Sequence, residues 1–108
     1  MAFKITKKPI FTVQVEVYTP NEKCGHDLSK FTARFNRVDM HQLDKLRDKK
    51  QPEVMREVLV GWEDFNDEEN NPVPFTPENL ETLINIPEAL QGLSLAFWEN
   101  VVKARKGN

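Results

Sequence analysis

The feature that most constrains this chain is a change in hydrophobic period near residue 38. Two segments before that point alternate apolar and polar residues. In Ile10–Tyr18 the apolar side chains of one face are Phe11, Val13, Val15 and Val17. In Lys30–Arg37 they are Phe31, Ala33 and Phe35. A period of two with β-branched and aromatic residues predicts two half-buried strands. Turn-forming residues lie between them, so we expect an antiparallel hairpin with a long loop.

Start and stop signals divide the rest of the chain into helices. Asp39 is placed to cap a helix that reaches about Lys50, and Pro52 lies near the first position of a second. We expect Gly61 to end this second helix, because glycine adopts the left-handed conformation without strain. Thr76 opens a third helix, and Pro87 opens a last one that runs to about residue 106.

These elements predict an α+β fold, with an N-terminal antiparallel β-hairpin or small sheet followed by three to four helices. A length of 108 residues fits a single domain, with a hairpin region over 1–38 and a helical region over 39–106. Cys24 is the only cysteine and has no internal disulfide partner, which favours a reducing compartment. No apolar run approaches the ~18 residues of a membrane helix, so we expect a soluble intracellular domain.

Helical spacing sorts the apolar residues of the last helix into two strips. Leu90, Leu93 and Phe97 fall on a core stripe, whereas Leu95, Trp98 and Val102 form a second strip beside it. We expect the second strip either to bind a partner or to be buried against the sheet. The predicted core comprises Val13, Val15, Phe31, Phe35, Leu59, Trp62, Phe75, Leu90 and Phe97.

Five carboxylates lie within residues 63–69 and raise the question of metal binding or acid catalysis. An EF-hand loop counted from Asp64 would have Glu69 where glycine is needed and Phe75 where the bidentate glutamate belongs. Adjacent acids in a loop are expected to be solvated rather than tuned as an acid pair. Cys24, His26 and His41 do not complete the four-ligand set of structural zinc. We therefore predict no enzyme activity, no catalytic residue, no metal and no cofactor.

The charge is distributed unevenly along the chain. Residues 1–50 hold 11 Lys/Arg against 6 Asp/Glu, a net charge of +5, and residues 51–108 hold 4 against 11, a net charge of −7. The basic half leaves open a small nucleic-acid-binding protein that uses the hairpin. Aromatic residues are not interleaved with basic ones in a stacking pattern, so this reading is the weaker one.

The order of elements from about Val54 to Val101 resembles the tail assembly chaperone family of long flexible-tailed phages. The residues that carry the resemblance are Val58-Leu59-Val60-Gly61-Trp62, Asp67-Glu68, Pro72-Val73-Pro74-Phe75, Asn79-Leu80, Leu83, Ile86-Pro87 and Ala96-Phe97. Members of that family tend to have glycine in the acidic turn where this chain has Asn70 or Asn71. Asparagine tolerates the left-handed region, so we expect the turn to survive.

The resemblance implies a non-enzymatic chaperone in the cytoplasm of the infected host cell. Such a protein binds the tape-measure protein, recruits tail-tube subunits and is absent from the mature virion. It also implies protein partners, with homo-oligomers possible, rather than nucleic acid or a membrane. A head–tail joining protein is a further alternative, and it would be retained in particles. The sequence leaves open the oligomeric state, the bound partner segment and any frameshift-extended form.

Overall fold

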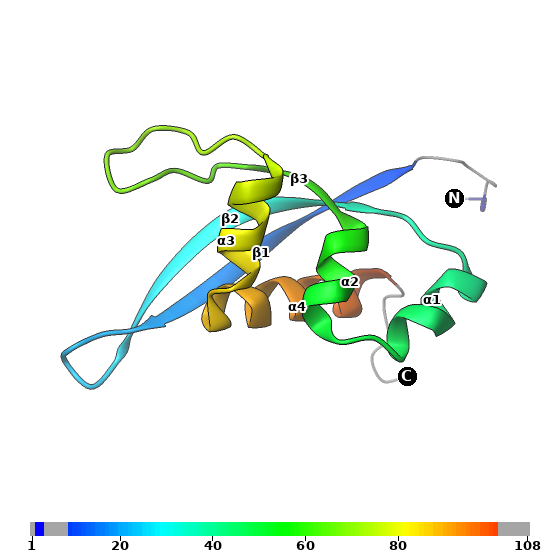
Figure 1. Ribbon diagram of the computed structural model, residues 1–108, viewed down its shortest axis with the longest axis horizontal. Helices are drawn as coiled ribbons and strands as arrows, with labels where there is room; N and C mark the ends of the chain where they lie inside the picture. Colours follow the sequence, from blue (N-terminus) through cyan, green and yellow to red (C-terminus); the bar gives the residue numbers. More distant parts are fainter. Residues whose placement is uncertain (1, 4–8, 102–108) are drawn as a thin grey trace.

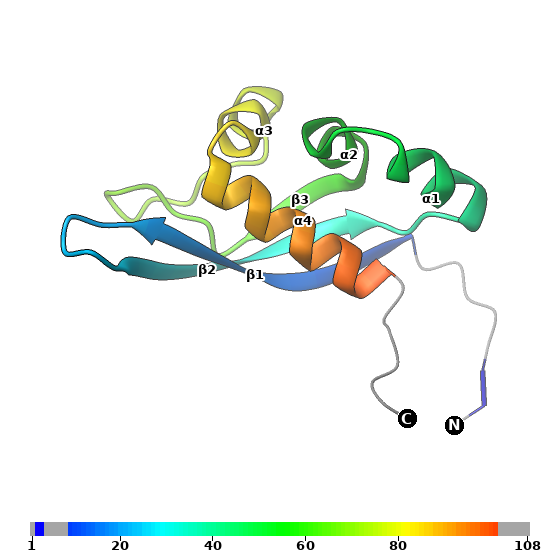
Figure 2. The same ribbon diagram turned by 90° about the horizontal axis from the view of Figure 1, so that it is seen from below.

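The computed structural model describes residues 2–3 and 9–101, which form an antiparallel sheet with helices on one face (Figures 1 and 2). The strands are β1 (Ile10–Pro20), β2 (His26–Asn36) and β3 (Leu59–Glu63), in the spatial order β1-β2-β3. The helices are α1 (Met40–Arg47), α2 (Gln51–Val58), α3 (Pro77–Ile84) and α4 (Pro87–Val101). The α+β prediction, with its N-terminal hairpin, is confirmed.

The hairpin of β1 and β2 has the expected alternation. Val15 pairs with Phe31 and Phe11 with Phe35, so the apolar residues of both strands share the face toward the helices. Val15 and Phe35 are completely buried. The turn is held by Asn21, whose side-chain oxygen accepts from the backbone N–H groups of Lys23 and Gly25 at 2.9 and 3.1 Å.

The helix starts follow the local signals. The side chain of Asp39 accepts from the N–H of Gln42 at 2.8 Å, and that of Thr76 accepts from the N–H of Asn79 at 3.1 Å. These bonds satisfy amides that have no partner within a helix, which is the function of an N-cap. α1 ends at Arg47 rather than near Lys50, because Lys50 is the N-cap residue of α2. For the last helix the described residues end at Val101, so its predicted extension to 106 lies outside them.

The prediction that Gly61 ends a helix is wrong. α2 ends at Val58, Leu59 is already extended (φ −81°, ψ 117°), and Gly61 lies within β3. This strand pairs with β2 through Ala33 opposite Trp62 and Arg34 opposite Gly61. A Cβ at position 61 would lie 3.2 Å from Cδ of Arg34. The absence of a side chain at Gly61 therefore leaves room for the Arg34 side chain on the neighbouring strand.

The core lies between the sheet and the helices, and Phe97 of α4 is at its centre. The Phe97 ring packs edge-on against Phe35, with centroids 5.3 Å apart, and stacks on Phe11 at 6.2 Å. Among the predicted core residues, Val13 and Leu90 are only partly buried. Phe75 corrects the prediction: it is 38% exposed and packs edge-on against Trp62, with centroids 4.7 Å apart.

Helix α4 approaches strand β1 closely at Gly92. A Cβ there would lie 2.5 Å from the carbonyl oxygen of Glu16 and 3.1 Å from Cγ1 of Val15. Because no side chain intervenes at this point, the helix backbone touches the backbone of β1 directly. This contact, which we call the Gly92 seam, fixes α4 beside β1.

Candidate functional site

The structure describes two residues of the predicted partner-binding strip, Leu95 and Trp98, and they differ in exposure. Leu95 is 53% exposed beside β1. Trp98 is half-buried, and its indole N–H donates to Oε1 of Gln51 at 2.9 Å, at the start of α2. The Trp98 ring also packs edge-on against Phe97, with centroids 5.1 Å apart. Val102 lies outside the described residues. Within the part of α4 that the structure describes, Leu95 is therefore the accessible member of the strip.

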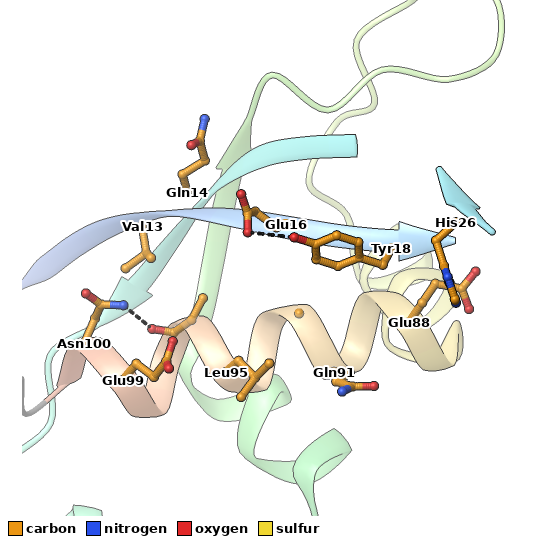
Figure 3. A pocket seen from close by; sticks show the side chains of 12 residues that line it. Val13, Gln14, Glu16, Tyr18, His26, Glu88, Gln91, Leu95, Glu99 and Asn100 are labelled. Carbon is orange, nitrogen blue, oxygen red and sulfur yellow. Dashed lines mark hydrogen bonds between the residues drawn. The ribbon is translucent and has the colours of Figure 1, made fainter. Parts of the chain in front are cut away.

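Leu95 lies in a groove between β1 and α4, shown in Figure 3. We call it the β1–α4 groove, and its volume is about 500 Å³. The wall from β1 carries Val13, Gln14, Glu16 and Tyr18. The wall from α4 carries Glu88, Gln91, Leu95, Glu99 and Asn100, with the Gly92 seam between the two walls.

The groove is acidic. Its lining contains Glu16, Glu88 and Glu99, and the described residues that line it include no lysine or arginine. Glu88 lies with His26 at one end of the groove, and Glu99 lies toward the other (Figure 3). Lys30 approaches Glu16 from β2, at 3.8 Å between Nζ and Oε2, in an exposed pair that offsets part of its charge. Glu16 also accepts from the hydroxyl of Tyr18 at 3.3 Å.

The wall from α4 could have been found in the sequence. Residues 88, 92, 95 and 99 follow a helical spacing of four, three and four, so they share one face of α4. A glycine in the middle of a helix lowers helix stability, so its presence indicates a packing reason, which here is the close approach of the β1 backbone. The wall from β1 had no comparable signal, because the sequence does not show which strand forms the edge of the sheet.

The acidic loop is an organised turn. Oδ1 of Asp67 accepts from the N–H groups of Glu69 and Asn71 at 2.9 and 3.0 Å. Asn70 adopts the left-handed conformation (φ 63°), as expected for a residue that replaces glycine there. The base of the loop is tied to the core by the Trp62 indole N–H, which donates to the carbonyl of Val73 at 2.7 Å.

The structure does not assemble the metal-ligating residues considered in the sequence. In residues 2–3 and 9–101 no three His, Cys, Asp or Glu side chains come close enough together to hold a metal ion. Cys24 is exposed in the hairpin turn, and His41 lies in α1, toward the opposite end of the molecule (Figure 1). No helix in the described part of the chain is long and apolar enough to cross a membrane.

An ion pair at the surface joins α2 to α3. Nε and Nη2 of Arg56 donate to the two carboxylate oxygens of Glu81 at 2.7 and 2.8 Å. These hydrogen bonds hold the pKa of Glu81 below its usual value and raise that of Arg56. The geometry is bidentate, so the pair fixes orientation between the two helices.

Comparison with protein families identified a match. The family model described as phage tail assembly chaperone matches residues 1–108, the whole chain. No curated protein and no solved structure matched it. Because the match covers every residue, including the hairpin that precedes the resemblance from Val54 to Val101, the chain belongs to the phage tail assembly chaperone family.

Proposed function

We propose that this protein binds the tape-measure protein during tail assembly and recruits tail-tube subunits to it. The observation that carries the proposal is the family match over the whole chain. A chaperone family implies a non-enzymatic role with phage tail proteins as partners. On this proposal the protein acts in the host-cell cytoplasm and is left out of the finished virion.

The exposure of Leu95 in the β1–α4 groove supports the proposal. A large aliphatic side chain that is half exposed in a groove offers apolar surface to a partner without being needed for the core. Trp98 is held by Gln51 and Phe97 and contributes to the packing of α4. We therefore assign partner contact to Leu95 first, and keep Trp98 and Val102 as contributors to the same binding strip.

The first test is co-expression of the tagged chain with the tape-measure protein of the same virus. We expect the tape-measure protein to accumulate in the soluble fraction and to co-purify with the chain. Tape-measure protein that stays insoluble with and without the chain would contradict the proposal. Mass spectrometry of purified particles separates a chaperone from a head–tail joining protein, because only the latter is expected in particles.

The second test separates binding from folding with two single variants. Leu95→Ser is expected to retain the thermal midpoint within about 4 °C, because surface substitutions change stability by about 0.5 kcal/mol or less, and to lose co-purification. Trp98→Ala removes the indole donor and a partly buried ring, so we expect it to lower the midpoint clearly. If Leu95→Ser folds and still binds the tape-measure protein, Leu95 is not part of the interface.

A further inference from the structure

We draw no further inference here: the strongest candidate, the surface at the projecting end of the β1–β2 hairpin (Figure 1), where the exposed Leu28 lies opposite Tyr18 beyond the residues of β2 that pair with β3, carries none, because nothing in the described part of the chain shows what covers it.

Discussion

Gly92→Ala tests the seam that positions α4 beside β1. Two effects of opposite sign compete at this position. Alanine is favoured over glycine inside a helix by about 1 kcal/mol, so at an open site the substitution would stabilise the protein. Here the new Cβ would lie 2.5 Å from the carbonyl oxygen of Glu16, closer than real Cβ atoms approach a neighbour. The obstacle is backbone, so rotation of a side chain cannot relieve the contact.

The helix must therefore move away from β1 by roughly half an ångström or more. Such a movement loosens the packing of Phe97, five residues further along α4, on Phe35 and Phe11. Overpacking of this kind costs about 1–3 kcal/mol, which exceeds the gain in helix propensity at the middle of that range. We expect a net destabilisation of about 1 kcal/mol, equivalent to a thermal midpoint lower by about 4–8 °C in a domain of this size.

Thermal unfolding followed by circular dichroism measures the change, with urea unfolding as an independent estimate of the free energy. Gly25→Ala provides a glycine control, because a Cβ at Gly25 meets only the side chain of Asn21, at 3.8 and 3.9 Å. We expect that control to shift the midpoint less than Gly92→Ala does. A midpoint for Gly92→Ala that is unchanged or higher than that of the parent chain would show that α4 does not press on β1, and the seam argument would fail.

Three further substitutions or additions follow from the same structure. Phe97→Ala should destabilise the protein by about 3–5 kcal/mol in urea unfolding, because the ring is completely buried; a cost below ~1 kcal/mol would place it at the surface. Ser94→Ala should raise stability by about 0.5–1 kcal/mol, because the buried Ser94 hydroxyl has no hydrogen-bond partner among the described residues; a clear loss of stability would reveal a partner. Calcium at millimolar and zinc at micromolar concentration should leave the thermal midpoint unchanged, since ligand at 100 times its Kd would add about 2.7 kcal/mol; a rise with either metal would reinstate a metal site.

The hairpin could be predicted because its two strands have a pattern that only one register satisfies. A shift of one residue would move Val15 and Phe31 from the core to the solvent, so burial of one face fixes the pairing. The caps at Asp39 and Thr76 could be predicted for a similar reason. Their side-chain oxygens bond to amides three residues later, an interaction that is encoded locally.

The strand β3 could not be predicted from local signals. Residues 58–62 begin in helical register with Val54 and Met55, and they contain the glycine that commonly follows a helix. These residues form a strand because the second edge of β2 would otherwise lack a hydrogen-bonding partner. Ala33 opposite Trp62 provides that partner and brings the indole over the core. A contact between segments about 30 residues apart outweighed the local preference.

The binding strip shows the same limit at the level of single side chains. Helical spacing separated Leu95 and Trp98 from the core stripe, whereas in the structure Leu95 is exposed and Trp98 packs partly against the core. Spacing alone did not show that Gln51 would accept the Trp98 indole N–H, or that β1 would lie beside Leu95. Those facts depend on how α4 crosses the sheet, and the crossing is determined by Gly92.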